Sequence, residues 1–349
     1  MNRFLLLAAV GAGGYLLWRA LRPRYDFADK HVLITGGSRG LGLVMARQLA
    51  GRGAKLTLCS RDGKELLRAQ DDLAARGFRK VLVVECDVAD ADRVREMVAV
   101  ARERNGPVDV LVNNAGVIQV GPMEEMRAAD YEQSLRIHFW AALHTTLAVL
   151  PDMKARGAGR IVNISSIGGK VAVPHLLPYS VGKFALVGFS DGLRAELARY
   201  GVTVTTACPG LMRTGSHLNA YFKGRHADEY AWFALLNGLP GLSVPAEAAA
   251  ARILDACAVG DAEVVVGLPA KAAIIGRALS PNLTANVMSL TNRWALPDPG
   301  GIGADMLRGR QSRGKLPAFV TGLIDRAAAR NNELHAAAVP PPLPHTPGA

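Results

Sequence analysis

Tyr179 and Lys183 stand four residues apart in the stretch YSVGK, and Ser166 lies thirteen residues before the tyrosine. On a helix, a spacing of four places two side chains on one face. The Lys183 ammonium could then lower the pKa of the Tyr179 phenol from about 10 toward the range of efficient acid/base catalysis. A serine hydroxyl could hold the same substrate oxygen. The pair alone is weak evidence, because such pairs usually form solvated helix faces.

A glycine-rich segment, HVLITGGSRGLGLVMARQLAGRG, lies about 140 residues earlier. Its apolar β-branched run predicts a strand, and the amphipathic run after the glycines predicts a helix. Gly36, Gly40 and Gly42 then stand where the backbone must turn sharply and let a pyrophosphate reach the N-terminus of the helix.

A second polar turn follows the strand in VDVLVNNAGV. It consists of Asn113, Asn114, Ala115 and Gly116. Cofactors bind at the carboxyl ends of strands in open parallel sheets, so this turn is a second candidate for cofactor contact.

With these residues the chain resembles the short-chain dehydrogenase/reductase family over about residues 28–268. Five ordered motifs carry the resemblance: TGxxxGxG (Thr35 to Gly42), an acidic pair after the third strand (Asp87, Val88), NNAG, the Ser166/Tyr179/Lys183 set, and PG followed by threonine (Pro209, Gly210, Thr214). The resemblance implies that Tyr179 donates the proton in reduction and that Ser166 orients the carbonyl. It implies that Lys183 binds the nicotinamide ribose and lowers the tyrosine pKa. Asp87 would approach the adenine, and Asn113 with its neighbours would brace the cofactor and the central strand.

The predicted cofactor site comprises these motifs and the tip of the second strand. Its residues are Gly36, Ser38, Arg39, Gly40, Leu41, Gly42, Ser60, Arg61, Asp87, Val88, Asn114, Ala115, Gly116, Tyr179, Lys183, Pro209, Gly210 and Thr214.

His138 departs from the family pattern. Many members carry an asparagine on the helix after NNAG, where it helps to hold a water between the active-site lysine and solvent, and the segment RIHFWAAL places His138 there. Histidine also donates and accepts hydrogen bonds and titrates near neutral pH. His138 is therefore either a catalytic replacement in the proton relay or a helix residue that fills space.

The tip of the second strand predicts which cofactor is used. Ser60 occupies the place of an acid that would select NAD, and Arg61 follows it, with Arg39 in the glycine-rich turn as a second cation. Paired guanidinium bonds suit a 2′-phosphate, so NADP is favoured over NAD. Asp62 has a spacing near that of an NAD-type acid. Asp62 and Glu65 also have the spacing of a capping box, which is the stronger interpretation.

The fold class predicted is α/β, a Rossmann-type doubly wound parallel sheet. Seven strand-like runs (HVLIT, KLTLC, VLVVEC, VDVLVN, RIVNIS, VTVTTAC, EVVVG) alternate with helical patterns. The domains expected are a hydrophobic anchor (1–24), an NADP-binding catalytic domain (25–270), a helical extension (271–335) and a proline-rich disordered tail (336–349).

Residues 4–18, FLLLAAVGAGGYLLW, carry no charge and precede Arg19, Arg22 and Arg24. The run is shorter than the roughly twenty residues that cross a bilayer, but flanking arginines can extend it by snorkelling. A cleaved signal peptide is the main alternative, although no convincing cleavage site follows. The pattern predicts a membrane-anchored protein with the lipid bilayer as partner and the catalytic domain on the cytoplasmic side.

The formal charge of +11 needs a partner of opposite charge. The arginines are scattered, without interleaved aromatic residues or a recognised binding module, which argues against nucleic acid. An anionic membrane surface and an anionic cofactor account for the excess more simply. The cysteines (Cys59, Cys86, Cys208, Cys257) lack metal-binding spacing, so no metal site is predicted.

Residues 211–241, LMRTGSHLNAYFKGRHADEYAWFALLNGLPG, stand in the place of the family's variable substrate loop. Their apolar and aromatic side chains predict a lipophilic carbonyl or alcohol substrate, or a lid that packs on its own domain: Leu211, Met212, Tyr221, Phe222, Tyr230, Trp232 and Phe233. In the extension, Leu283, Val287, Leu290 and Trp294 have helical spacing, typical of core or dimer contacts. A homodimer or homotetramer is expected.

The function predicted is an NADP-dependent oxidoreductase that transfers a hydride between the nicotinamide and a carbonyl or alcohol. One alternative is a membrane-bound cofactor-binding sensor or scaffold without turnover. The presence of Ser166, Tyr179 and Lys183 at working spacing argues against it. Another is an NAD-dependent epimerase, for which an acid would be expected in place of Ser60.

Overall fold

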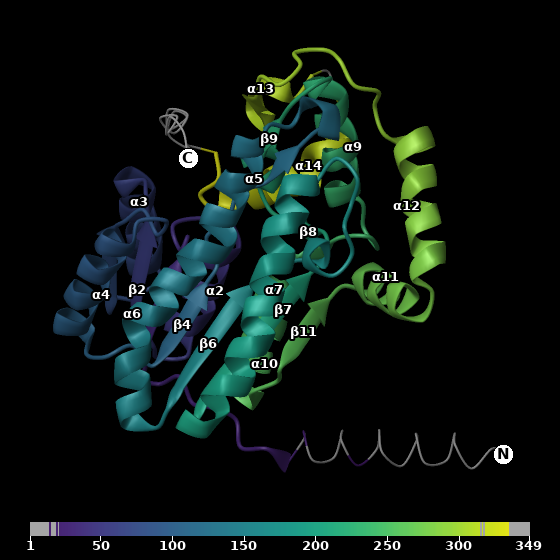
Figure 1. Ribbon diagram of the computed structural model, residues 1–349. Coiled ribbons are helices and arrows are strands. Elements are labelled where there is room, and N and C mark those ends of the chain that lie inside the picture. Colours follow the sequence, from purple (N-terminus) through teal and green to yellow (C-terminus); the bar gives the residue numbers. More distant parts are fainter. Residues whose placement is uncertain (1–13, 15–18, 20, 315, 317, 335–349) are drawn as a thin grey trace, which may run out of the picture.

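Seven parallel strands form the central sheet (Figure 1). In chain order they are β1 (His31–Thr35), β2 (Lys55–Ser60), β3 (Val81–Glu85), β4 (Val110–Asn113), β6 (Gly159–Ile164), β7 (Val202–Pro209) and β11 (Glu263–Val266). They lie side by side in the order β11-β7-β6-β4-β1-β2-β3. The computed structural model describes residues 14, 19, 21–314, 316 and 318–334. The predicted doubly wound α/β fold is confirmed.

Helices cover both faces of this sheet. One face carries α2 (Gly40–Gly51), α3 (Gly63–Ala75) and α10 (Ala246–Val259). The other face carries α4 (Ala91–Asn105), α6 (Ala141–Arg156) and α7 (Leu177–Leu197). Strands buried on both faces read as continuous apolar runs, which is why HVLIT and KLTLC predicted them correctly.

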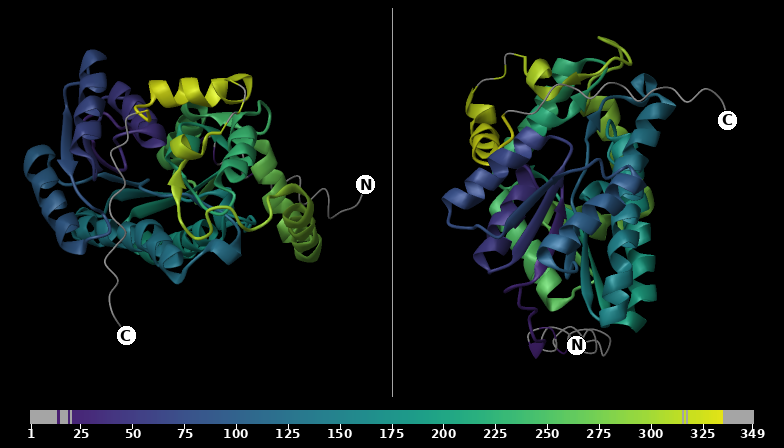
Figure 2. Two further views of the ribbon diagram at one scale, coloured as in Figure 1. Left: turned by 90° about the horizontal axis from the view of Figure 1, so that it is seen from above. Right: turned by 90° about the vertical axis from the view of Figure 1, so that its left-hand side faces the viewer.

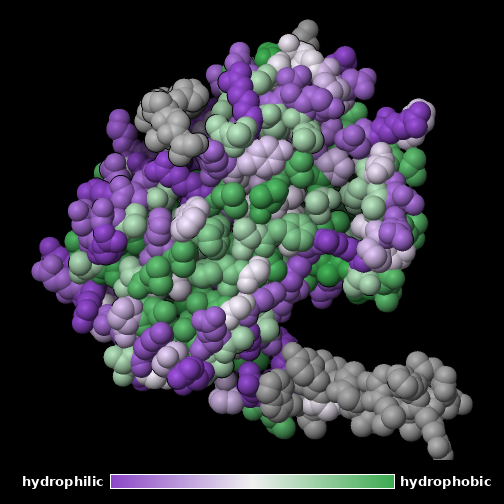
Figure 3. Space-filling model, in the orientation of Figure 1, coloured by the Kyte–Doolittle hydropathy of each residue, from purple (hydrophilic) through white to green (hydrophobic). Residues whose placement is uncertain are grey.

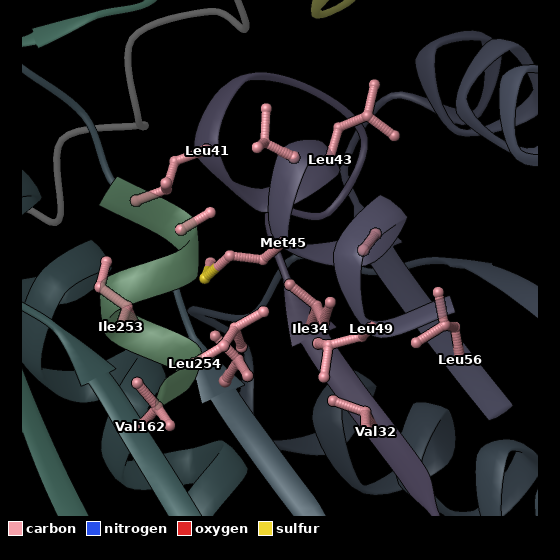
Figure 4. Close-up of a cluster of buried hydrophobic side chains, with 14 of the residues drawn as sticks. Val32, Ile34, Leu41, Leu43, Met45, Leu49, Leu56, Val162, Ile253 and Leu254 are labelled. Carbon is pink, nitrogen blue, oxygen red and sulfur yellow. The ribbon is translucent and has the colours of Figure 1, made fainter. Parts of the chain in front are cut away.

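The apolar core between α2, α10 and the sheet holds the glycine-rich turn in place. Figure 4 shows Met45 of α2 pointing toward α10, with Ile34 of β1 beside it and with Leu254 of α10 and Val162 of β6 below. All four side chains are completely buried. Burying a side chain of this size contributes about 1.5–3 kcal/mol, so this packing fixes where α2 begins.

The crevice for a ligand lies where β1 pairs with both β2 and β4. From β1 the chain moves to β2 and β3 on one side and then crosses to β4 on the other. Loops after β1 and β4 therefore diverge at their carboxyl ends, which leaves an opening between them.

Shorter elements build the roof over this crevice. They are β5 (Gln119–Val120), β8 (Met212–Arg213), β9 (Tyr221–Phe222), β10 (Val244–Pro245), β12 (Leu307–Arg308), η1 (Met123–Glu125), α5 (Ala128–Leu135), η2 (Arg136–Trp140), η3 (Ile167–Gly169), α8 (Ser216–Asn219) and α9 (His226–Gly238). At the opposite ends of the strands, η4 (Ala198–Tyr200) joins α7 to β7. The strands β5, β9 and β12 form a three-stranded sheet, and β8 pairs with β10.

The C-terminal part of the chain ends near the first strand of the sheet, β1. Its helices are α11 (Leu268–Leu279), α12 (Pro281–Ala295), α13 (Gly309–Ser312) and α14 (Ala318–Arg330). Ile324 of α14 packs with Tyr230 and Phe233 of α9. Seen from above, α14 (yellow) lies beside the purple N-terminal part of the domain (Figure 2). The stripe on α12 is exposed: Leu283, Val287, Leu290 and Trp294. The predicted tail, 336–349, lies outside the described residues.

The predicted membrane localisation is contradicted. In the part of the chain that the structure describes, no helix is long and apolar enough to cross a membrane. Residues 4–18, which suggested an anchor, lie outside the described residues except for residue 14. The apolar run was in any case shorter than a spanning helix requires, and the lipid bilayer is not retained as a partner.

Candidate active site

A pocket of about 550 Å³ opens at the carboxyl ends of the strands. All of the predicted cofactor residues line it except Gly42, and so do Ser166 and His138. A second, more open hollow of about 700 Å³ lies near Arg22, Arg160 and Arg194, and none of the motif residues line it. The sequence motifs therefore converge on one pocket.

Ser166, Tyr179 and Lys183 meet at one wall of the pocket. Ser166 follows β6, while Tyr179 and Lys183 lie one turn apart in α7. The Lys183 Nζ atom is 5.7 Å from the centre of the Tyr179 ring and donates to the Ile164 carbonyl oxygen at 2.8 Å. A Cβ on Gly168 would lie 3.0 Å from the Tyr179 ring, so the loop after Ser166 packs closely on the phenol.

The protonation of this wall differs from the expected one. Burial raises the pKa of Tyr179 to about 12, and a hydrogen bond with Ser166 opposes that shift. Burial also lowers the pKa of Lys183 to about 7. Desolvation is the largest cause of both shifts and favours the uncharged form of each group.

His138 lies in η2, a single π-helical turn between α5 and α6. Such turns often occur at functional sites. The Val117 N–H donates to Nε2 at 3.3 Å, so Nε2 is an acceptor, and Nδ1 is 3.1 Å from the Ser134 hydroxyl. Burial, and then the charge of Lys183, lower the pKa of His138 well below its usual value. His138 is therefore a neutral histidine whose ring lies edge-on to Tyr179, 5.4 Å between centres.

The glycine-rich turn is locked to the NNAG turn. The Thr35 hydroxyl accepts from the N–H groups of Asn114 and Ala115, at 2.9 and 3.1 Å. The Asn114 side-chain amide donates to the carbonyl oxygens of Thr35 and Gly36. A Cβ on Gly42 would collide with the Gly36 carbonyl. Gly42 thus shapes the turn without lining the pocket.

The edge of the pocket at the tip of β2, which was predicted to select the cofactor, contains a residue whose role the sequence did not reveal. Asp62 caps α3 by accepting from the Glu65 N–H at 3.0 Å, as the capping interpretation requires. The buried Glu65 carboxylate, however, accepts from Arg39 at 2.7 Å and from the Ser38 hydroxyl at 3.1 Å. Arg39 is therefore paired with a carboxylate, while Ser60 and Arg61 line the pocket.

The roof of the pocket is apolar. Of the predicted substrate-loop residues, Leu211, Met212, Tyr221, Trp232 and Phe233 line the pocket, whereas Phe222 and Tyr230 are buried in the core beside α14. Glu229, fully buried, accepts from Trp232 Nε1 at 2.6 Å and lies 2.6 Å from His175 Nδ1. This contact joins α9 to the loop before Tyr179.

A known protein family shares the sequence motifs that line this pocket. The family profile described as short chain dehydrogenase matches residues 30–221. The chain belongs to the short-chain dehydrogenase family. It is an NAD(P)-dependent oxidoreductase, and members of this family typically act on small molecules and oligomerise.

Three relatives of this short-chain dehydrogenase are informative. Dehydrogenase/reductase SDR family member 7B of Danio rerio is 34% identical over 221 residues, 61% of this chain and 72% of the relative. The 3-ketodihydrosphingosine reductase of Mus musculus is 35% identical over 215 residues, 59% of this chain and 65% of the relative. A gluconate 5-dehydrogenase of Burkholderia cenocepacia J2315, solved with NADP and tartrate, is 26% identical with a TM-score of 0.63, covering 72% of this chain and 98% of that one.

In the part of the chain that the structure describes, no group of three or more His, Cys, Asp or Glu residues could hold a metal ion. The cysteines, all buried and free, are Cys59, Cys86, Cys208 and Cys257.

Proposed function

We propose that this short-chain dehydrogenase is an NADP-dependent carbonyl reductase or alcohol dehydrogenase. The observation that carries the proposal is the meeting of Ser166, Tyr179 and Lys183 at one wall of the pocket that the glycine-rich turn also lines. Proton transfer and cofactor binding can then occur within one space.

The turn suits a dinucleotide. Gly36 and Gly40 have φ values of +62° and +54°, and a Cβ on Gly36 would lie 3.0 Å from the Ala115 backbone. Side chains are thus excluded where a phosphate must approach the backbone. When bound, the nicotinamide supplies or accepts the hydride.

Ser166, Tyr179 and Lys183 would carry out the proton transfer. The Tyr179 hydroxyl donates it to the substrate oxygen in reduction, and the Ser166 hydroxyl holds that oxygen. Lys183, with a pKa of about 7, is partly protonated at neutral pH. An anionic dinucleotide nearby would favour its charged form, and the charge would then favour the Tyr179 phenolate.

Selection of NADP would rest on Ser60 and Arg61. Neither offers a carboxylate to ribose hydroxyls, and a guanidinium can engage a 2′-phosphate through paired bonds. Arg39 supports this edge less than expected, because Glu65 already binds it. The NADP bound by the gluconate 5-dehydrogenase is in keeping with this preference.

The preference is tested by replacing Ser60 with Asp and Arg61 with Ile in one variant. The new carboxylate accepts from ribose hydroxyls and repels a phosphate, so the ratio of kcat/KM for NADPH over NADH should fall by about tenfold or more. Initial rates with both cofactors measure it. A parent enzyme that already prefers NADH would contradict the proposal.

The substrate proposed is a lipophilic carbonyl compound. Leu211, Trp232 and Phe233 provide an apolar roof, and the 3-ketodihydrosphingosine reductase relative is named for a long-chain ketone. Purified enzyme with NADPH should reduce long-chain 3-oxo compounds, ketosteroids or long-chain aldehydes faster than short polar ketones. Equal or higher kcat/KM for polar ketones would refute the lipophilic class.

A homodimer or homotetramer is proposed as the working form. Apolar residues gather on the face shown in Figure 3, over the region of α6 and α7. Trp140 at the end of η2 and Leu147 of α6 are about half exposed, at 48% and 56%. Light scattering would reveal a monomer if this proposal is wrong.

A further inference from the structure

Residues 331–333, which we call the latch, follow α14 and lie against the glycine-rich turn. The Asn331 carbonyl oxygen accepts from the Gly40 N–H at 3.0 Å. The Asn332 side-chain amide donates to the Ser38 carbonyl oxygen at 2.9 Å and to the Glu65 carbonyl oxygen at 3.0 Å. The C-terminal segment thus contacts the backbone of the turn itself.

Arginines from three elements hold the latch in position. Arg47 of α2 donates to the Asn331 side-chain oxygen at 2.7 Å, Arg68 of α3 to Asn332 Oδ1 at 2.9 Å, and Arg310 of α13 to the Glu333 carbonyl oxygen at 3.1 Å. Asn332 has a φ of +57°, which asparagine tolerates better than most residues. The latch is a specific docked conformation.

Glu333 brings a carboxylate into the crevice. Its Oε2 accepts from the Gly215 N–H at 2.5 Å, and a Cβ on Gly40 would lie 3.1 Å from its Oε1. The residue is only 4% exposed and lines the same pocket as the motif residues. The carboxylate therefore lies between the start of α2 and the loop after β8.

This is the place where an anionic ligand would be bound. The N–H groups and dipole at the start of a helix attract a phosphate, and the glycine-rich turn places a pyrophosphate there. A carboxylate and a pyrophosphate repel each other strongly where water is excluded. When both are present, the carboxylate must become neutral or one of the two groups must leave the site.

We propose that the latch competes with the dinucleotide for the glycine-rich turn and that Glu333 thereby sets cofactor affinity. The inference rests on the proposed cofactor site. It concerns residues outside the matched family segment, which ends at residue 221.

The ionisation of Glu333 gives this competition a pH dependence. Burial raises its pKa to about 7, and Arg39 and Glu65 act in opposite directions. The charged or titratable side chains on the surrounding elements include Arg39, Arg47 of α2, Glu65 and Arg68 of α3, His217 of α8, Arg308 of β12 and Arg310 of α13. Above about pH 7 the carboxylate predominates and opposes the dinucleotide, whereas below it the neutral acid does not.

Glu333→Gln in the full chain tests the proposal. At pH 8, one unit above a pKa of about 7, only about a tenth of Glu333 is neutral, so the parent should bind the dinucleotide about tenfold more weakly than the glutamine variant. At pH 6 the two should bind about equally. Calorimetry with NADH and NADPH measures both affinities, and NADH excludes titration of the 2′-phosphate. Glu247→Gln, the same change in α10 where Glu247 pairs with Arg330 of α14, should leave binding unaltered.

Asn332→Gly gives an independent test. Glycine keeps the positive φ but removes the side-chain hydrogen bonds to Ser38 of the turn and to Glu65 of α3, so both dinucleotides should bind more tightly than to the parent. Hydrogen exchange should also show residues 326–334 of the parent exchanging faster when NADPH is added. The latch proposal would be overturned if either variant bound the dinucleotides more weakly than the parent, or if the parent and Glu333→Gln bound them equally at pH 8. Slower hydrogen exchange of residues 326–334 on addition of NADPH would also overturn it.

These outcomes separate the latch from the proposed function. A parent that prefers NADH, with Glu333→Gln still binding more tightly at pH 8, refutes NADP selection and supports the latch. A parent that prefers NADPH, with no gain from either variant, refutes the latch alone. If neither parent nor variants bind a dinucleotide, both proposals fall.

Discussion

The ionisable groups at the two ends of the pocket lie in different environments. At the end formed by Tyr179, Lys183 and His138, burial shifts each pKa toward the uncharged form. At the glycine-rich end, Arg39 and Glu65 form an ion pair at 2.7 Å. Lys183, whose pKa is about 7, can gain or lose a proton near neutral pH, whereas the Arg39–Glu65 ion pair is a fixed contact. The Tyr179 end is thus suited to moving a proton, and the glycine-rich end to holding charged groups.

The largest effect should come from Tyr179→Phe. The ring and its packing remain, and only the oxygen that transfers the proton is lost. We expect kcat for carbonyl reduction to fall by about 100-fold or more, while NADPH affinity stays nearly unchanged. Steady-state rates and a fluorescence titration test the two halves separately. Turnover within a few-fold of the parent would remove Tyr179 from the proposed mechanism.

Lys183→Met should weaken both catalysis and cofactor binding, yet stabilise the fold. The folded pKa of Lys183, about 7, lies below its unfolded value of about 10.5, so the unfolded chain binds more protons between these pH values. The stability of the parent should therefore rise with pH across this window, and methionine should raise Tm most at or below pH 7.

Lys170→Met is the matched control for that substitution. Burial acts to lower the pKa of Lys170, but its ion pair with Glu263 at 2.5 Å outweighs burial and raises the pKa overall. Removing it should lower Tm at pH 7. If Lys183→Met also lowers Tm, burial of the Lys183 amine does not destabilise the folded protein as we infer.

His138→Asn should have the smallest effect. Because burial lowers the pKa of His138 well below its usual value, we expect no titration of the ring near neutral pH. We expect kcat to change by no more than about threefold. The pH–rate profile of the variant should keep every limb that the parent shows near pH 6.5. A limb near that pH in the parent that is lost in the variant would make His138 a titrating member of the relay.

The sequence predicted the sheet and most of the pocket because those signals are local. Strand runs such as HVLIT depend on burial alone, and the glycine positions depend on turn geometry. The protonation of Tyr179 and Lys183 could not be predicted, because it depends on how deeply both are buried. Glu65 was predicted correctly at the start of α3, but its reach to Arg39 depends on how α3 packs beside the turn. Asn332 and Glu333 gave no signal, because their partners lie at the other end of the chain.

That separation affects the order in which the protein is assembled during synthesis. Asn332 meets Ser38 across 294 residues. At a translation rate of about 5–20 residues per second, the glycine-rich turn precedes the latch by roughly 15–60 s. The strands that hold the turn are complete before α14 has been made. A nascent chain therefore presents an open crevice to the cellular dinucleotide pool, and the first occupant of the site can arrive before its competitor has been synthesised.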